Sequence, residues 1–262
     1  MVFGIQFING AIDLFDPVKL AKEIESVVVE GTLRKYYRTA RPGRWYGGIA
    51  TADCCGCNLR CVFCWSGAPR DHPENIGRFY SPEQIFRALD ACAKKFGYHQ
   101  LRASGNEPTI GKEHLLRLLE LVGDTNHSFI LESNGILIDA DYARRLSAFK
   151  NVHVRVSIKG TNPQEFSKLT GAIPEAFDLQ LRALRELMNA GVSCHPAVML
   201  SFSPKENLEE LKERLRAIDQ SLAEGVEEEY VFLYPIVARR LSRAGIKPLV
   251  AYSPDGIPSE LI

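Results

Sequence analysis

The sequence lacks the features that would place the protein in or across a membrane. No apolar run approaches the about 18 uncharged residues that a membrane-spanning helix requires. The apolar start of the chain has no basic region and is interrupted by Asp13 and Asp16, unlike a secretory signal peptide. These absences predict a cytoplasmic protein with no membrane partner.

An excess of charge of either sign is also missing, because 32 basic residues balance 32 acidic residues. This balance excludes a protein that coats nucleic acid through bulk charge, although it leaves room for a local basic patch. Disorder is excluded as the main state, since 45% of the 262 residues are hydrophobic and can fill a sizeable core. The composition predicts one large folded domain or two small ones.

What the sequence does contain is an uneven distribution of cysteine. Five of the seven cysteines lie between residues 54 and 64, whereas a disulfide framework would spread them through a small secreted chain. Cys54, Cys57, Cys61 and Cys64 form four thiolates that could hold a structural zinc ion or a ferredoxin-like cluster. Cys57, Cys61 and Cys64 alone would hold three corners of a [4Fe–4S] cubane and leave its fourth iron open to another ligand.

After residue 47 the chain alternates short apolar runs with longer segments of helical periodicity. Ser81-Pro82-Glu83-Gln84 is typical of a capped helix start. The alternation is typical of parallel βα units and predicts an α/β fold, an open partial (β/α)6 barrel, with a doubly wound sheet as the alternative. The six expected parallel strands are residues 48–52, 100–104, 128–133, 152–158, 192–200 and 230–234.

The barrel is expected to occupy residues 47–235. Residues 1–46 precede it as an N-terminal helical extension, with one helix from Pro17 to about Glu30, and residues 236–262 follow as a C-terminal tail. A single helix is expected over residues 207–222, before the last strand.

The cysteine loop resembles the cluster loop of the radical S-adenosylmethionine (SAM) superfamily. It has the spacing Cys57-x3-Cys61-x2-Cys64, the aromatic Phe63 before the last cysteine, and a strand leading into it. Three further family-like patterns follow in order, each at the expected C-terminal end of a strand, where the catalytic groups of βα barrels collect. The branch of pyruvate formate-lyase-activating enzymes is the most similar.

These patterns imply a SAM site. Gly105-Asn106-Glu107-Pro108 is similar to the family's Gly-Gly-Glu-Pro turn, which holds the SAM amino group, with Asn106 in place of the second glycine. Ser133-Asn134-Gly135 is close to the Thr-Asn-Gly of the activating enzymes, and Ser157-Ile158-Lys159 resembles their Asp-x-Lys with Ser157 replacing the acid. The resemblance implies that SAM is bound by Phe63, Gly105, Asn106, Glu107, Pro108, Ser133, Asn134, Ser157 and Lys159.

The resemblance also implies an oxidoreductase in which Cys57, Cys61 and Cys64 are the catalytic ligands of a [4Fe–4S] cluster. With one electron from an external flavodoxin- or ferredoxin-like reductant, such enzymes cleave SAM to a 5′-deoxyadenosyl radical that abstracts hydrogen from the substrate. The substrate would be a protein, in glycyl-radical chemistry, or a small molecule. The alternative from a different functional class is that the protein is a non-catalytic iron–sulfur or zinc protein.

A basic strip keeps a second substrate class open. Arg34, Lys35, Arg38, Arg41 and Arg44 are interleaved with aromatic residues and no acidic one, a pattern typical of RNA binding. The strip is expected to form a cationic collar across the barrel opening, or else a solvated strap that closes the barrel edge. RNA is therefore a possible partner through residues 34–44, and modification of tRNA or a nucleotide-like substrate is the alternative function. A second basic group, expected to complete the collar, is Arg239, Arg240, Arg243 and Lys247.

Four further residues receive predictions. Cys54 and Cys55 are expected to be dispensable for the cluster. Trp65 is expected to cover the cluster loop, because an indole excludes water without adding charge. Of the six histidines, only His195 occupies a strand position that could face the barrel interior, where a core histidine with satisfied hydrogen bonds is the simpler interpretation.

Overall fold

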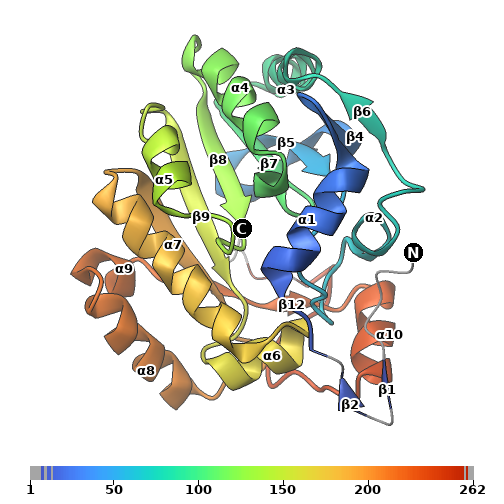
Figure 1. Ribbon diagram of the computed structural model, residues 1–262, viewed down its shortest axis with the longest axis vertical. Helices are drawn as coiled ribbons and strands as arrows, with labels where there is room; N and C mark the ends of the chain where they lie inside the picture. Colours follow the sequence, from blue (N-terminus) through green and yellow to red (C-terminus); the bar gives the residue numbers. More distant parts are fainter. Residues whose placement is uncertain (1–6, 9–10, 13, 257, 259–262) are drawn as a thin grey trace.

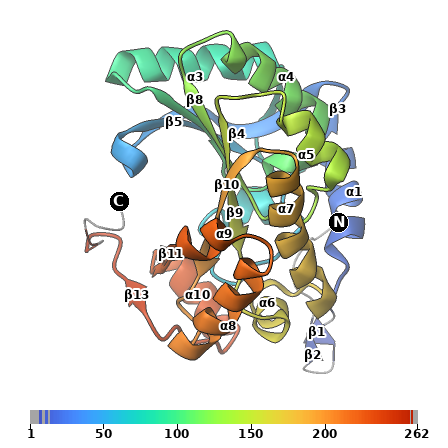
Figure 2. The ribbon, with the colours of Figure 1, turned by 90° about the vertical axis from the view of Figure 1, so that its left-hand side faces the viewer.

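The computed structural model describes residues 7–8, 11–12, 14–256 and 258. Its centre is a curved sheet of nine strands with helices on its outer side (Figure 1, Figure 2). Six neighbouring strands are mutually parallel, which confirms the expected α/β partial barrel. In sheet order these strands are β5 (Ile49–Cys54), β7 (Gln100–Ser104), β8 (Ser128–Ser133), β9 (Val152–Ile158), β10 (Ser193–Met199) and β11 (Glu227–Glu229).

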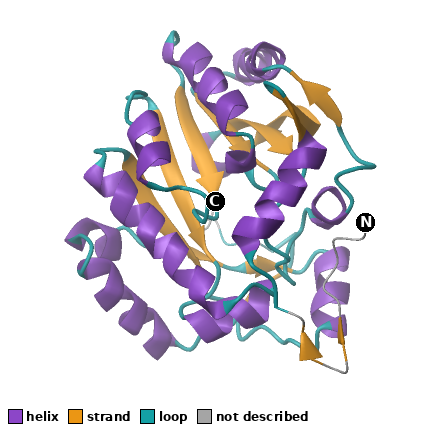
Figure 3. Cartoon of the chain, in the orientation of Figure 1, coloured by secondary structure: helices purple, strands orange, loops and turns teal. Residues whose placement is uncertain are grey.

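Helices connect successive parallel strands and cover the outer face of the sheet, as Figure 3 shows with helices in purple. The capping box predicted at Ser81 and Gln84 is present at the start of α3. The helices and short 3-10 turns of this region are α2 (Gly67–Asp71), α3 (Pro82–Phe96), η2 (Pro108–Ile110), α4 (Lys112–Gly123), α5 (Ala140–Leu146), α6 (Pro163–Thr170), η3 (Pro174–Ala176), α7 (Phe177–Asn189), α8 (Lys205–Arg216) and α9 (Gln220–Glu224).

Alternate residues of the parallel strands face two different environments. Leu101 and Phe129 are fully buried in the core cluster that the helices share with the sheet. Complete burial of one such side chain stabilises the fold by roughly 2–3 kcal/mol. The intervening residues, among them Arg102, Glu132 and Arg155, lie on the opposite face because strand side chains alternate. The barrel interior is therefore polar and its outer face is apolar.

The N-terminal extension contains strands as well as the expected helix, so its helical description was incomplete. After α1 (Pro17–Val28), strand β4 (Leu33–Gly43) pairs antiparallel with β5 at the edge of the parallel strands. This strand was not recognisable from the sequence, because the consecutive charged residues Arg34 and Lys35 do not suggest a strand in which both are buried. The remaining strands of the extension are β1 (Phe7–Ile8), β2 (Ala11–Ile12) and β3 (Val29–Glu30). Strand β6 (Arg78–Tyr80), which follows α2, pairs antiparallel with β4.

The last parallel strand is not where the sequence predicted it. Residues 230–234 were expected to form it, whereas β11 consists of the three glutamates Glu227–Glu229. Val231–Phe232 instead forms β12, which pairs with β13 (Ala251–Tyr252). Consecutive glutamates have low strand propensity, and the ion pairs of Glu227 and Glu229 with Arg155 inside the barrel offset it in this strand. The predicted helix over 207–222 is also divided, into α8 and α9.

The segment expected to be a C-terminal tail contributes α10 (Pro235–Arg243) as well as β13. Near it, the 3-10 turn η1 (Trp45–Gly47) meets the end of the barrel: the Trp45 ring stacks on Phe232, with centroids 6.0 Å apart. The Tyr46 hydroxyl donates to Glu227 at 3.3 Å. We call these two contacts the barrel seam. Within the described ranges, no helix combines the length and apolarity needed to span a bilayer.

Candidate active site

The cysteine loop leaves the C-terminal end of β5 and is attached to the end of α6. The amide of Arg60 donates to the carbonyl of Thr170 at 3.1 Å, and the amide of Val62 donates to the carbonyl of Leu169 at 2.9 Å. The guanidinium of Arg70 donates to the carbonyl of Cys61 at 2.5 Å. Main-chain and arginine hydrogen bonds therefore order the loop without using the cysteine side chains.

The environment of the three family-pattern thiols suits metal ligation. Burial raises the pKa of Cys61 to about 11, although the Lys159 ammonium opposes the shift, and burial raises the pKa of Cys57 further. Buried thiols release their protons when a metal cluster supplies the positive charge. The Cys57 sulfur also accepts from the amide of Leu59 at 3.4 Å, and such hydrogen bonds stabilise cluster thiolates. The donor set thus fits an iron–sulfur cluster.

Cys54 and Cys55 have different contacts. The Cys54 thiol donates to the carbonyl of Ser104 at 3.2 Å, and the Cys55 thiol donates to the carbonyl of Ile76 at 3.4 Å. Both side chains are completely buried. In the part of the chain that the structure describes, no three histidine, cysteine or acidic residues converge closely enough to share one metal ion. Cubane thiolates bind separate irons, so these contacts favour the set Cys57, Cys61 and Cys64 over a zinc site.

The turn after β7 packs directly on β5. Gly105 has φ +95°, and a Cβ atom there would lie 2.8 Å from the Cα of Asp53, so only glycine fits. Asn106 has no positive φ, which explains why it can replace a glycine of the family pattern. Its side-chain amide donates to the carbonyl of Ser66 at 3.1 Å, while its Oδ1 is buried without a partner. This oxygen is an available acceptor for an ammonium group such as that of SAM.

Glu107 ties the turn to its neighbours. Its buried carboxylate accepts from the hydroxyl of Thr109 at 2.6 Å and from that residue's amide at 3.1 Å. It also accepts from the hydroxyl of Ser133 and the amide of Asn134, both at 2.8 Å. Four protein donors therefore satisfy the carboxylate, and Pro108 begins η2 directly after it. This arrangement gives Glu107 the role of holding the ends of β7 and β8 together.

Asn134 connects the end of β8 to the cysteine loop. Its side-chain amide donates to the Oδ1 of Asn58 at 2.7 Å, and its Oδ1 accepts from the amide of Ile136 at 3.0 Å. The side chain of Gln180 on α7 donates to the carbonyls of both Asn134 and Ser157, at 2.7 and 2.9 Å. The residues of the second and third family patterns are thus connected through one buried glutamine.

The pattern after β9 meets the cysteine loop from the other side. The Lys159 ammonium lies 5.9 Å from the ring centroid of Phe63, donates to the hydroxyl of Ser157, and lies 3.8 Å from Glu229. Trp65 is 45% exposed, so it covers the loop from the solvent side only in part. The structure therefore gathers every residue of the expected SAM site around the C-terminal ends of β5, β7, β8 and β9.

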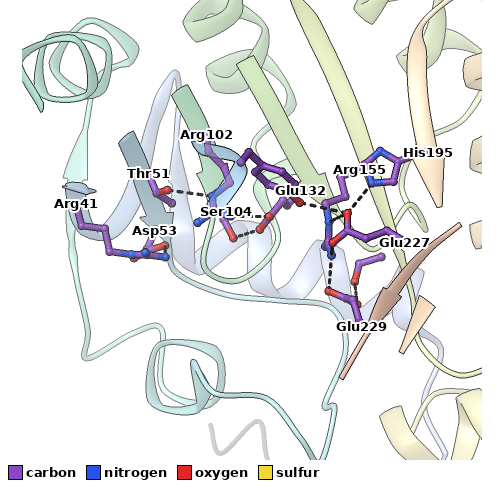
Figure 4. Close-up of polar contacts among 12 residues, drawn as sticks. Arg41, Thr51, Asp53, Arg102, Ser104, Glu132, Arg155, His195, Glu227 and Glu229 are labelled. Atoms are coloured by element: carbon purple, nitrogen blue, oxygen red, sulfur yellow. Dashed lines mark hydrogen bonds and ion pairs between the residues drawn. The ribbon is translucent and has the colours of Figure 1, made fainter. Parts of the chain in front are cut away.

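Sequence reasoning missed a row of charges inside the barrel, shown in Figure 4. Arg102 donates to Glu132 at 2.8 Å, and Arg155 contacts Glu227 at 2.6 Å and Glu229 at 2.9 Å. A polar residue at every second position of otherwise apolar strands was the available signal. We call this set the interior charge row: Asp53, Arg102, Glu132, Arg155, Glu227 and Glu229.

The arginines of this row keep its glutamates ionised. Burial opposes the ionisation of Glu132, yet Arg102 and Arg155 lower the pKa of its carboxyl below the usual range. Burial likewise opposes ionisation at Glu229, where Arg155 and Lys159 lower the pKa. The accessible groups of the row are the glutamates, since Arg102 and Arg155 are almost completely buried.

The basic strip is divided between structural and exposed cations. Arg34 is buried and donates to the carbonyls of Val28, Lys35, Cys55 and Glu107. The buried Lys35 ammonium donates to the carbonyls of Pro73 and Glu74. These two cations are not available to a phosphate. Two more are paired, Arg41 with Asp53 and Arg240 with Asp71, and the exposed ones are Arg38, Arg44, Arg239, Arg243 and Lys247.

Comparison with known proteins identifies the family of this chain. Residues 53–218 match the sequence family described as the radical SAM superfamily. The chain therefore belongs to the radical SAM superfamily, whose enzymes use a [4Fe–4S] cluster and SAM, which confirms the expected class and cofactors. The match is to the superfamily as a whole and does not test the expected activating-enzyme branch.

Two curated relatives are similar over part of the chain. A probable GTP 3',8-cyclase of Methanosarcina acetivorans is 30% identical over 154 residues, which cover 58% of this chain and 44% of the relative. Mycofactocin maturase MftC of Mycolicibacterium smegmatis is 26% identical over 157 residues, 60% of this chain and 38% of the relative. The chain thus spans less than half the length of these relatives.

Two solved structures share the fold. Streptococcus suis SuiB bound to precursor peptide SuiA superposes with a TM-score of 0.55 and 20% identity, covering 65% of this chain and 36% of SuiB. TYW1 with a lysine-pyruvate adduct superposes with a TM-score of 0.51 and 14% identity, covering 75% of this chain and 72% of TYW1. At these identities the likeness supports the partial barrel fold alone.

Proposed function

We propose that this chain is a radical SAM enzyme that abstracts a hydrogen atom from a small, charged organic molecule bound inside the barrel. The observation that carries the proposal is the interior charge row, to which β5, β7, β8, β9 and β11 each contribute. A purely structural core would be apolar, because buried ion pairs rarely stabilise a fold more than well-packed apolar residues do. The row therefore supports a binding role.

Residues of this chain would hold both cofactors. Cys57, Cys61 and Cys64 would ligate the [4Fe–4S] cluster, and the unpartnered Oδ1 of Asn106 would accept from the SAM amino group. When bound, the two cofactors supply a 5′-deoxyadenosyl radical from the one-electron reductive cleavage of SAM. The electron would come from an external flavodoxin- or ferredoxin-like protein. Lys159, between Phe63 and Glu229, would orient anionic groups at the interior end of the site.

A small charged substrate fits the interior better than an extended protein loop does. An extended strand is bound mainly through main-chain hydrogen bonds. The interior instead offers carboxylates of Glu132, Glu227 and Glu229 over buried arginines. A molecule that carries charges of both signs can exchange its own groups for these existing pairs, so little uncompensated charge is buried on binding.

The test is reductive SAM cleavage by the anaerobically reconstituted protein, with 5′-deoxyadenosine and methionine as the measured products. GTP, which the curated relatives' name includes, and free amino acids are the first probes. A true substrate should accelerate cleavage, and Glu132→Gln should abolish the acceleration while leaving basal cleavage unchanged. Glu228→Gln is the matched control, because Glu228 is an exposed residue of the same strand as Glu227 and Glu229.

Two results would contradict the proposal. Absence of SAM cleavage by cluster-containing protein would remove the radical SAM activity. Acceleration by a glycine-containing peptide loop that does not depend on Glu132 would return the substrate to the glycyl-radical class.

RNA or a nucleotide-like substrate is the second candidate. The observation that favours it is the exposure of four arginines, Arg38 on β4, Arg44 directly before η1, and Arg239 and Arg243 on α10. Phosphate contacts of that kind would depend steeply on salt concentration.

A further inference from the structure

Four polar side chains form a continuous hydrogen-bonded chain at the end of the barrel opposite the cysteine loop. The hydroxyl of the exposed Ser193 lies 2.7 Å from Nδ1 of His153. His153 Nε2 lies 2.5 Å from Nδ1 of His195. His195 Nε2 lies 2.8 Å from a carboxylate oxygen of Glu227, a contact that Figure 4 shows. The sequence favoured a histidine with satisfied hydrogen bonds at His195, at a position that could face the interior, and both ring nitrogens of His195 have partners. These hydrogen bonds lead from solvent to the interior charge row.

The chemistry of the acceptor at one end sets the direction of every donor. Ionised Glu227 can only accept, so Nε2 of a neutral His195 must carry the proton and its Nδ1 must accept. His153 must then donate through Nε2 and accept at Nδ1, which receives the hydroxyl proton of Ser193. All three donors therefore point inward, which is the orientation of a chain ready to deliver a proton to Glu227.

The inner end of the chain reaches the expected substrate region. Glu227 is opposite Ala197 in the β10–β11 register, and Ala197 is opposite Ser157 of the expected SAM site. The strained Tyr46, the only non-glycine residue with positive φ in the described ranges, donates its hydroxyl to the same carboxylate. Backbone strain of this kind concentrates at functional sites.

We propose that Ser193, His153 and His195 relay protons from solvent to Glu227, and that Glu227 is the acid that protonates the substrate inside the barrel. The second half rests on the proposed function, since it requires a substrate in the interior. In one passage a hydronium ion of the solvent gives a proton to Ser193 and becomes water, and the proton that the Ser193 hydroxyl carried goes to His153 Nδ1. His153 Nε2 passes its proton to His195 Nδ1, and His195 Nε2 passes its proton to Glu227. Ring rotation then restores both imidazoles.

The charged groups around these four hydrogen-bonded side chains are compatible with proton transfer toward Glu227. Burial and the neighbouring His195 lower the pKa of His153, which favours the neutral form of this imidazole. Burial opposes the ionisation of Glu227, but His195 and Arg155 lower its pKa strongly. The Tyr46 hydroxyl on η1 also faces this carboxylate, and Glu132 and Glu229 share the charge of Arg155 with it. A substrate carboxylate that lies beside the accessible Glu227 would raise the pKa of the Glu227 carboxyl, because two like charges disfavour each other, so protonation of Glu227 depends on substrate.

The first experiment determines the tautomers by long-range ¹H–¹⁵N spectroscopy of histidine-labelled, anaerobically reconstituted protein at neutral pH. His153 and His195 should both carry the proton on Nε2. His114 is the internal control with the opposite tautomer, because its Nδ1 faces the carbonyl of Thr32 at 2.8 Å and its Nε2 faces the hydroxyl of Tyr36. A proton on Nδ1 of His195, or an imidazolium there, would overturn the inward orientation.

The second experiment separates a relay from a structural hydrogen-bond chain. His153→Gln can still donate and accept but cannot pass a proton through, so exchange of the His195 Nε2 proton with water should slow by about tenfold or more. The exposed Ser193→Ala should slow it in the same direction and keeps the test valid if His153→Gln does not fold. Glu227→Gln should remove the preference of His195 for a proton on Nε2, whereas Glu228→Gln should leave that preference unchanged.

Unchanged exchange in both relay variants would mean that water reaches His195 directly, and the relay would be wrong. These measurements need neither SAM nor turnover. A protein that gives the expected tautomers and exchange rates but cleaves no SAM would lose the proposed function and keep the relay. If the protein cleaves SAM but the relay variants exchange the His195 Nε2 proton as fast as the wild type, the proposed function would stand and the relay would be wrong.

Discussion

The guanidinium of Arg34 donates a hydrogen bond to the main-chain carbonyl of Glu107 at 3.3 Å, across 73 positions of the sequence. The same nitrogen donates to the carbonyl of Cys55 at 2.5 Å. One buried arginine from the N-terminal strand β4 thus joins the cysteine loop to the turn of the expected SAM site. A strand outside the parallel barrel therefore organises the candidate active site.

Replacing Arg34 with Met should lower the free energy of unfolding by about 3 kcal/mol or more, because several buried carbonyls lose their donor. Cluster content should fall with it. Arg38→Met on the same strand is the control and should cost only about 0.5 kcal/mol, since Arg38 is 53% exposed and makes a long ion pair. Denaturant unfolding of both variants measures the difference, and equal losses would contradict the role of Arg34.

Alanine variants of the cysteines should fall into two groups. Cys57→Ala, Cys61→Ala and Cys64→Ala should lose the [4Fe–4S] cluster, whereas Cys54→Ala and Cys55→Ala should retain it. The two buried thiols of the second group already donate to carbonyls. Iron and sulfide content with visible absorbance after anaerobic reconstitution tests this. Loss of the cluster in Cys54→Ala as complete as in Cys61→Ala would favour the four-thiolate site.

Asn106→Ala should weaken SAM binding by about tenfold, the loss expected when a buried ammonium loses one acceptor. Asn106→Asp keeps the acceptor but loses the donation to the Ser66 carbonyl, so it should bind SAM more tightly than Asn106→Ala does. Both variants should retain the cluster. Isothermal titration with SAM under anaerobic conditions gives the affinities, and an unaltered affinity of Asn106→Ala would move the amino-group site elsewhere.

Glu107→Ala should weaken SAM binding with the cluster intact, as the family resemblance implies. From the structure we also expect the free energy of unfolding of this variant to fall by about 1–3 kcal/mol. The reason is that Thr109, Ser133 and the amide of Asn134 lose their shared acceptor. Glu120→Ala, at an exposed residue of α4, is the control. If Glu107→Ala unfolds at the denaturant concentration of the control, its carboxylate does not hold the two strand ends together.

Stability should decrease in acid through His114. Burial lowers the pKa of this residue to about 4, against the opposing effect of the Thr32 carbonyl, while an unfolded histidine titrates near 6.5. Folding therefore releases a proton, so the free energy of unfolding falls as the pH decreases from about 6.5 to about 4, by ~3 kcal/mol in all. Measured against His114→Gln, which does not titrate, the stability difference should shrink across that range. Parallel pH profiles would show that His114 does not titrate as expected.

The exposed arginines on β4, directly before η1 and on α10 test the RNA alternative. Replacing Arg38, Arg44, Arg239 and Arg243 together with Gln should leave basal SAM cleavage unchanged. If the wild-type protein binds tRNA, the variant should flatten the salt dependence by about 0.9 log unit for each duplex phosphate that it no longer neutralises. Arg41→Gln is a contrasting variant that should be destabilised, because it leaves the completely buried Asp53 without its close partner. Absence of salt-dependent binding in the wild type would remove this alternative.

Local patterns predicted much of the fold. The expected strands at 100–104, 128–133 and 152–158 coincide with β7, β8 and β9, because each is an apolar-rich run bounded by turn or helix-start signals. The cap at Ser81 was equally readable. Strands β4 and β11 were missed because their charged residues are balanced by partners far away in sequence, which no local pattern reveals.

The sequence by itself determined the superfamily and the expected cluster ligands, since Cys57, Cys61 and Cys64 lie close together in the chain and their spacing is the chemical signal. Only the tertiary structure decided what fills the barrel interior. Arg155 and Glu227 are 72 positions apart, and curvature of the sheet brings them into contact. Each of these charged residues would be costly to bury alone, so its place depends on a partner that the folded chain supplies.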